Sequence, residues 1–256
     1  MVEMDDHDPP THNAHYFNNA ALSDVTIHFG DDNEQLKLHR VILASSSEHF
    51  RKMFEGGFAE ATAKDIHLED DDPEALYGLL AWCYGLSYNG SHTFPVHTNY
   101  EEPLYYGSGD LDDEGHLTYM AYLYVAADKY LMLQLKEHAR QNFQWATIRF
   151  VERYHGVYTD PEYLSEFVDV LEEVATVVYD ALRDGAQKLR PYLASAVHEY
   201  IGYLVDDEHF KKLMVDIPEL SRDLLVMGTK RTPGYTYLNY TGRRPTLDGF
   251  VVPEDE

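Results

Sequence analysis

LSDVTIHFG, residues 22–30, opens the stretch of sequence that decides the fold. From Val25 to Phe29 every second side chain is apolar, which is the period of a half-buried strand. Gly30–Asn33 has the composition of a turn, and the alternation resumes through Leu36 and Leu38. The pattern therefore predicts a β-hairpin over residues 22–41.

Helical spacing replaces this alternation from Ile42 onward. The apolar side chains between Leu43 and Phe54 can share one face, so we expect a single helix that ends at Gly56-Gly57. Residues 65–68 have the pattern of a short third strand. Asp72 followed by Pro73 is typical of a helix start, and this helix should end near Gly85.

The second half of the chain is dominated by helical patterns. A polar, Gly-rich loop is expected at residues 87–115, and a pair of short helices between Leu117 and about Trp145. A capped helix starts at Asp160-Pro161 and should form a hairpin with a second helix, and two shorter helical pieces follow. We thus expect a flexible acidic segment (1–21), a domain (22–145) with the inserted loop, a helical region (160–227) and a tail (228–256).

Charge and composition narrow the classes of partner. The chain of 256 residues has 45 acidic and 20 basic residues, a net charge of −25, which disfavours nucleic acid and anionic membranes. Its apolar runs are too short to span a bilayer, and its single Cys83 is expected to be a small buried side chain. We expect a cytoplasmic or nuclear protein. The tail residues Lys230, Arg231, Arg243 and Arg244 are locally basic and could fold back on the acidic body.

Four segments together resemble the BTB/POZ family in their order and spacing. They are LSDVTIHFG (22–30), LKLHRVILASSSEHFRKMFEGGFAEA (36–61), DIHLEDDDPEALYGLLAWCYG (65–85) and LYVAADKYLMLQLKEHA (123–139). The resemblance implies an α+β fold, in which helices cover a small three-stranded sheet. The helices that follow resemble the C-terminal helical region of many fungal family members.

Several functional expectations come from this resemblance. It implies a non-enzymatic module that docks protein partners or dimerises through the first helix and strand, with Tyr16, Phe17, Leu22 and Val25 at the dimer interface. It also implies a partner-binding pocket around Asp24, His39 and Arg40. The alternative is that Asp24 and Arg40 form a buried pair or a cap that only fixes the hairpin.

A cullin-type ubiquitin ligase scaffold is the alternative partner that the resemblance raises. Family members that bind a cullin carry a hydrophobic-x-acid motif ahead of the helix that contains Ala127–Tyr130. The corresponding position here is Tyr119-Met120-Ala121, which has no acid. A substrate adaptor of such a ligase is therefore the second expectation.

Other kinds of site find little support in the sequence. Residues 110–115 resemble the start of a calcium loop, but position 12 is Ala121 instead of Glu. His7, His12 and His15 lack the fixed scaffold that a metal site needs. The motifs of nucleophile elbows, phosphate loops and zinc proteases are missing from the sequence. We therefore expect no enzyme activity, no cofactor and no metal.

Overall fold

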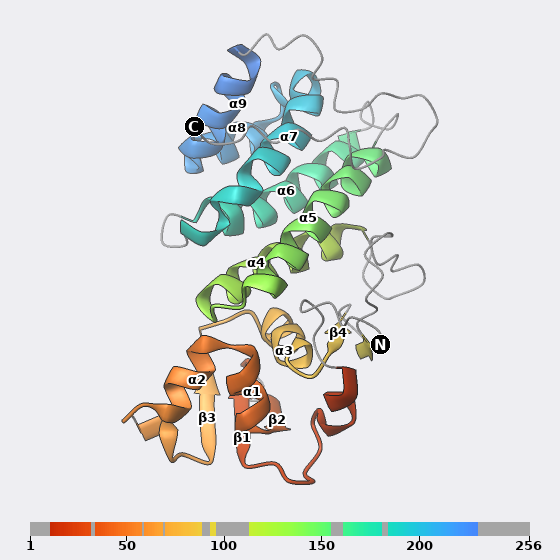
Figure 1. The fold of residues 1–256 in the computed structure, drawn as a ribbon. Helices are drawn as coiled ribbons and strands as arrows, with labels where there is room; N and C mark the ends of the chain where they lie inside the picture. Colours follow the sequence, from red (N-terminus) through yellow and green to blue (C-terminus); the bar gives the residue numbers. More distant parts are fainter. Residues whose placement is uncertain are drawn as a thin grey trace, which may run out of the picture.

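A small sheet with its helices occupies one end of the molecule, and a bundle of helices occupies the other (Figure 1). The computed structural model describes residues 11–31, 34–57, 59–68, 70–88, 93–95, 113–154, 161–180 and 184–229. The sheet has the strand order β2-β1-β3, with β1 Val25–Phe29, β2 Glu34–Leu38 and β3 Asp65–Leu68. β1 pairs antiparallel with β2 and parallel with β3, and its side chains alternate between buried and half-buried as predicted.

Two short helices stand where the spacing predicted one. They are α1 Arg40–Ser46 and α2 Glu48–Glu55, and Ser47 between them has extended backbone angles, φ −140° and ψ 125°. Ser47 Oγ accepts a hydrogen bond from the backbone N–H of Phe50, which caps α2, and donates one to the Tyr130 carbonyl at 2.7 Å. The single-helix prediction was wrong because this cap requires a break in the helix.

The next helix, α3 Pro73–Trp82, starts as predicted with Asp72 as its N-cap. Its interior is fully apolar, and it packs against α4 so closely that a larger residue at position 78 would displace the Tyr119 side chain. A Cβ atom at Gly78 would lie 2.1 Å from the Tyr119 hydroxyl oxygen. The sequence pattern gave no sign of this contact.

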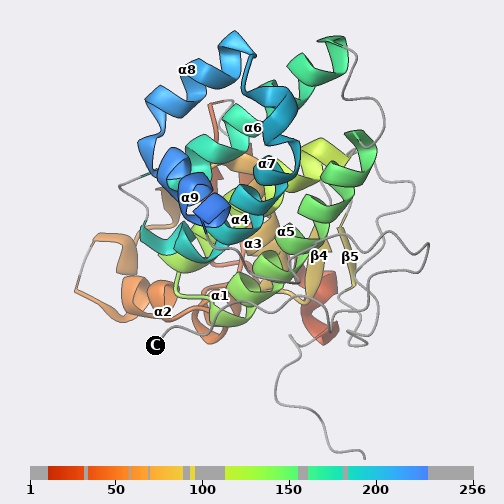
Figure 2. The same cartoon turned by 90° about the horizontal axis from the view of Figure 1, so that it is seen from above.

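Regular structure also lies inside the expected loop 87–115. Two strands, β4 Leu86–Tyr88 and β5 Thr93–Pro95, pair with each other, and α4 Asp113–Lys129 begins before the loop was expected to end (Figure 2). The loop prediction was wrong for these residues. Short strands with mixed polar sequence carry too little periodicity to be recognised.

The described N-terminal residues begin with a 3₁₀ helix, η1 Thr11–Tyr16, within the segment that was expected to be flexible. Phe17, which follows it, stacks edge-on against Tyr77 of α3 and against Tyr84, at ring distances of 5.4 and 5.5 Å. These aromatic contacts give residues 11–21 a place on the domain surface that their polar composition did not predict. Residues 1–10 lie outside the described residues.

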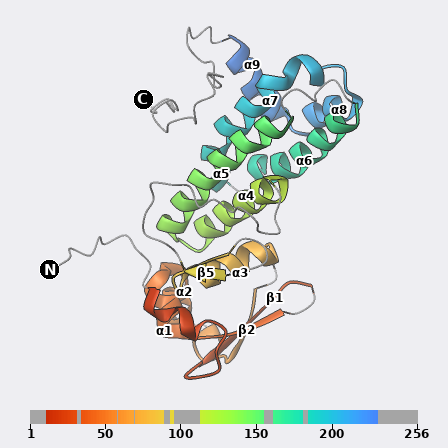
Figure 3. The same cartoon turned by 90° about the vertical axis from the view of Figure 1, so that its right-hand side faces the viewer.

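The helices α4 and α5 Leu133–Tyr154 lie between the sheet domain and the remaining helices (Figure 3). α5 is 22 residues long and continues past Trp145, where the second short helix was expected to end. It also runs through the predicted domain boundary at residue 145. α4 packs against α3 on one side and α6 on the other, so the two predicted regions share one hydrophobic core.

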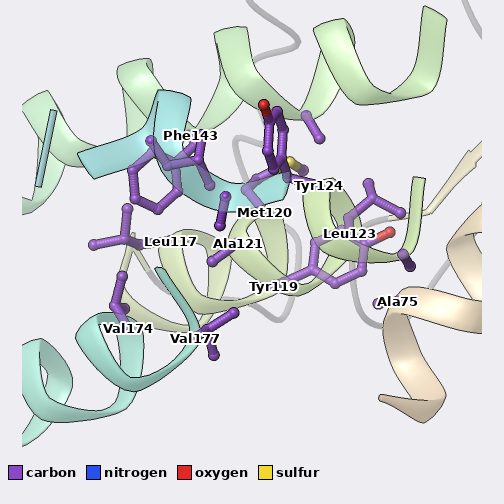
Figure 4. Packing of buried hydrophobic residues seen from close by; sticks show 14 of the residues in the cluster. Ala75, Leu117, Tyr119, Met120, Ala121, Leu123, Tyr124, Phe143, Val174 and Val177 are labelled. Carbon is purple, nitrogen blue, oxygen red and sulfur yellow. The ribbon is translucent and has the colours of Figure 1, made fainter. Parts of the chain in front are cut away.

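The remaining helices are α6 Pro161–Tyr179, α7 Arg190–Leu204, α8 Glu208–Asp216 and α9 Pro218–Thr229, with a 3₁₀ helix, η3 Asp184–Leu189, before α7. As expected, α6 and α7 pack together, and α7 also packs against α5 and α9. Figure 4 shows Val174 and Val177 of α6 facing Leu117 of α4, with Phe143 of α5 beside them. The predicted α+β fold followed by an all-helical region is confirmed.

Candidate interaction surface

His39 forms the centre of a buried hydrogen-bond network between β2 and α1. Its side chain is 5% exposed, and its Nε2 lies 2.8 Å from the Ala21 carbonyl oxygen while its Nδ1 lies 3.0 Å from the Tyr84 hydroxyl. The backbone N–H of His39 donates to the same hydroxyl at 2.8 Å. A neutral ring that carries its proton on Nε2 satisfies all three bonds, because Tyr84 then accepts from the backbone and donates to Nδ1.

Tyr84 is thus a residue of this site that the sequence analysis missed. It lies just after α3, 45 residues from His39, and burial raises the pKa of its hydroxyl. No local pattern marks it, since a tyrosine at the end of an apolar helix has the same sequence signature whether or not it has a distant partner. The hydroxyl joins α3 to the start of α1.

Replacing Tyr84 by phenylalanine should lower the free energy of unfolding by about 1–3 kcal/mol. The substitution keeps the ring in place but leaves the buried backbone N–H of His39 and its Nδ1 without their partner. Urea denaturation monitored by circular dichroism measures the loss. Tyr16→Phe is the control, because the Tyr16 hydroxyl has no hydrogen bond within the described part of the chain. Equal stability of the two variants would contradict this role for Tyr84.

Asp24 and Arg40 meet through the backbone and not through their charges. The Asp24 carboxylate accepts a hydrogen bond from the backbone N–H of Arg40 at 2.8 Å, at the first residue of α1. The Arg40 guanidinium turns away and donates to the carbonyls of Glu60 and Ala61 at 3.2 and 2.8 Å, and also to that of Ala63. It lies 4.8 Å from the Phe54 ring centre.

This geometry gives the predicted pocket residues clear structural roles. Asp24 caps the helix that follows the hairpin, as one of the two alternatives proposed, and Arg40 fastens residues 60–63 to α1. His39 is buried and fully hydrogen-bonded. The three residues lie close together, but their side chains form hydrogen bonds with backbone groups of this same chain.

The four predicted interface residues fall into different environments. Val25 is 3% exposed and belongs to the core, and Tyr16 and Phe17 are half-buried against His39, Tyr77 and Tyr84. Leu22, in contrast, is 82% exposed. Its backbone lies in the left-handed region with φ 64°, which is costly for a side chain of this size.

Val41 of α1 is a second exposed apolar side chain in this part of the molecule, at 75%. Two hydrogen bonds join the segments that carry Val41 and Leu22, one from the Arg40 N–H to the Asp24 carboxylate and one between the His39 ring and the Ala21 carbonyl. We name Leu22 and Val41 together the N-terminal apolar patch. A signal for Val41 exists in the sequence, since Val41, Ile42 and Leu43 are consecutive and a helix with one buried face cannot cover all three.

Among the described residues, neither a cluster that could hold a metal ion nor a helix long and apolar enough to cross a bilayer is present. Cys83 is fully buried, and burial raises the pKa of its thiol to about 12. Tyr119, Met120 and Ala121, which align with the cullin motif, are all buried in α4. The first part of the calcium-like loop, residues 110–112, and the tail beyond residue 229 lie outside the described residues.

Comparison with known proteins identifies the first domain. The family model of the BTB/POZ domain matches residues 14–98, and within the described part of that range lie the sheet and helices α1 to α3. An Arabidopsis thaliana protein named "ARM repeat protein interacting with ABF2" is 39% identical over 69 residues, which are 27% of this chain and 9% of that protein. Mouse Kelch-like protein 1 is 35% identical over 69 residues, with the same two shares.

A BTB/POZ domain-containing protein of Arabidopsis thaliana is 38% identical over 66 residues, 26% of this chain and 20% of its own length. This chain therefore spans a fifth or less of these three relatives. Residues 14–98 form a BTB/POZ domain, and domains of this family bind protein partners and self-associate. The family model and these matches each cover about a third of this chain or less.

Proposed function

We propose that this chain is a non-enzymatic protein-interaction module whose BTB/POZ domain, residues 14–98, self-associates through the N-terminal apolar patch. The exposure of Leu22 and Val41 is the observation that carries the proposal. Burying a leucine or valine side chain contributes about 1.5–3 kcal/mol of stabilisation. A chain without a partner lacks this stabilisation at both Leu22 and Val41. The proposal also places the protein in the cytoplasm, the nucleus or both.

The backbone of Leu22 supports this assignment. A non-glycine residue in the left-handed region is held there by its surroundings, and such positions cluster at functional sites such as ligand clamps and switch regions. Here the Ala21 carbonyl is fixed by His39, and the Asp24 carboxylate by the Arg40 N–H. The two bonds rigidify the segment and hold Leu22 outward, which reduces the entropy lost on association.

The pocket residues contribute indirectly in this proposal. Because Asp24, His39 and Arg40 bond to their own chain, we assign them to shaping the patch, while Leu22 and Val41 provide the contact. A cullin scaffold remains the second candidate partner. It ranks lower because the residues aligned with the cullin motif are buried in α4 and present no side chain to a partner.

Charge on the patch should abolish self-association. We expect the full chain to be a dimer at micromolar concentration by light scattering, and Leu22→Glu with Val41→Glu to weaken the dimer at least about 100-fold. Both side chains are exposed in the single chain, so the double variant should keep the circular dichroism spectrum of the parent, and its lower unfolding midpoint should reflect only the lost dimer. Point variants are preferable to removing residues 1–21, which would also strip Phe17 from Tyr77 and Tyr84.

Leu133→Glu is the matched control, since Leu133 is 78% exposed but lies at the turn between α4 and α5. It should leave the dimer intact. A parent chain that stays monomeric up to about 100 μM would overturn self-association and leave the patch to a different protein. Loss of the dimer in the control as well would show that any added negative charge is disruptive on a chain of net charge −25.

A further inference from the structure

The surface at the far end of the molecule, where α8 meets α9, leaves three apolar side chains uncovered. Val215 is 78% exposed, Leu225 71% and Val226 43%. The hydroxyl of Ser221 donates to the Met214 carbonyl at 2.7 Å, which holds the end of α8 against α9. Val215 follows Met214, and Leu225 lies one turn beyond Ser221 in a helix that packs against α8, and we name Val215, Leu225 and Val226 together the α8–α9 corner.

The rest of both helices is amphipathic in the usual way. Phe210 and Leu213 of α8 and Leu220 and Leu224 of α9 are buried, so the apolar residues of the corner are in excess of what the bundle core uses. Leaving three aliphatic side chains uncovered near the end of the bundle exposes apolar surface to water, which is unfavourable. A segment that covers these three side chains would be held in place by the burial of their apolar surface.

We propose that residues 230–252 of the same chain cover the α8–α9 corner, with the basic residues Arg243 and Arg244 held by the acidic helical region. α9 ends at Thr229, only four residues after Leu225, and the sequence continues to Glu256. A segment tethered this closely has a local concentration in the millimolar range, so even weak contacts suffice. Residues 235–252 also contain apolar and aromatic side chains that could cover the corner: Tyr235, Tyr237, Leu238, Tyr240, Leu247, Phe250, Val251 and Val252.

Charge distinguishes this occupant from a generic apolar partner. Residues 230–247 have four basic residues and no acidic one. Residues 161–229 have 14 acidic and six basic residues, and α6, which packs against both α8 and α9, has no lysine or arginine. The corner itself has mixed charge, with Lys212 near Asp216 and Arg222 near Asp223.

The acidic residues of α6 are the counterpart that we assign to the two arginines. Asp169 and Glu172 are 65% and 41% exposed and share His209 of α8, at 3.2 and 2.9 Å, as their neighbour. Glu173 is exposed on the same helix. Attraction between the two arginines and these carboxylates would guide the tethered segment toward the bundle. Contact with the apolar side chains of the α8–α9 corner would then determine where the segment binds.

Photocrosslinking in the full chain tests the proposal. With p-benzoylphenylalanine in place of Leu225, we expect crosslinks within one molecule to residues 240–252, identified by mass spectrometry. Crosslinks to residues 230–239 are not counted, because the tether alone brings them near. Arg243→Glu with Arg244→Glu should reduce the counted crosslinks about fivefold, as should 0.5 M salt, since both weaken the charge attraction.

The same label in place of Leu133, a leucine of similar exposure, is the matched control and should give few such crosslinks. Equal yields from the two positions, or yields that ignore both charge reversal and salt, would overturn the proposal. Crosslinked products with twice the mass of the chain would instead show that a second copy of this chain covers the α8–α9 corner. The variants with changed tail residues retain Leu22 and Val41, so failure here is separate from failure of self-association at the N-terminal apolar patch.

Discussion

Lowering the pH from 7.5 to 5 should reduce the free energy of unfolding by about 2–4 kcal/mol through two buried histidines alone. His116 of α4 and His138 of α5 are 5% and 7% exposed, and burial lowers the pKa of each to about 4. The positive charge of either ring would also oppose protonation of the other, since His138 lowers the pKa of His116. The His138 ring centre lies 4.8 Å from that of Trp82 at the end of α3, so His138 lies where the first domain meets the helices.

The direction of this change in unfolding free energy follows from how many protons each state binds. In the unfolded chain both rings bind a proton near pH 6.5, while in the folded chain they stay neutral until the pH approaches 4. Between these values the unfolded state binds more protons, so stability is fully present above about pH 6.5 and falls as the pH is lowered. Each ring loses at most about 3.4 kcal/mol, which is 2.5 pKa units at 1.36 kcal/mol each.

The experiment compares slopes of unfolding free energy against pH for the parent chain and for His116→Gln with His138→Gln. The double variant removes both titrations, so its slope between pH 7.5 and 5 should be smaller by about 2–4 kcal/mol in total, whatever its absolute stability. His198→Gln, at an exposed position of α7, should keep the slope of the parent. Identical slopes in the parent and the double variant would refute the buried, neutral state of these rings.

Replacing Phe167 by alanine should cost about 3–5 kcal/mol. The ring is 1% exposed and stacks on Phe150 of α5 at 4.7 Å, with Tyr154 at 5.2 Å and Tyr200 of α7 at 5.1 Å. Four aromatic rings from three helices thus meet at one point, and alanine would leave a cavity that fixed helices cannot close. The hydroxyl of Tyr200 donates to the Val151 carbonyl at 2.6 Å, which restrains relaxation further.

Tyr163→Ala on the same helix is the control, because Tyr163 is 45% exposed and should change stability by less than about 1 kcal/mol. Thermal and urea unfolding of both variants provide the measurement. The predicted loss should appear in a single transition, since α4 and α5 connect the BTB/POZ domain with the bundle. A separate early transition in Phe167→Ala would show that the helices after residue 161 unfold independently.

Strands β1 to β3 and the start of α3 could be predicted because local sequence determines them. Alternation in residues 25–29 places one face of the strand in the core, and Asp72-Pro73 supplies a cap and a fixed backbone angle without help from distant residues. The match in the order and spacing of four segments then indicated the domain family. The fold class followed from these local signals, since a small sheet must be covered by helices.

The candidate site was predicted only in part. The sequence indicated that Asp24, His39, Arg40 and Leu22 lie near the hairpin, but not which of them face a partner. Only the tertiary structure brings the Tyr84 hydroxyl to His39 and turns the Arg40 guanidinium toward residues 60–63. Hydrogen-bond partners far apart in sequence leave no periodic signal. The run Val41-Ile42-Leu43 indicated that one of these three side chains would be uncovered, while the exposure of Leu22 became visible only in the structure.

The sequence by itself determined the α+β class, the BTB/POZ resemblance and the acidic character that disfavours nucleic acid. Tertiary structure decided the break at Ser47, the course of α5 through residue 145, and which apolar residues are left uncovered. The physical reason is that strands and capped helix starts are fixed by neighbouring residues. A helix break, a boundary or an exposed patch depends on atoms from elements distant in the sequence.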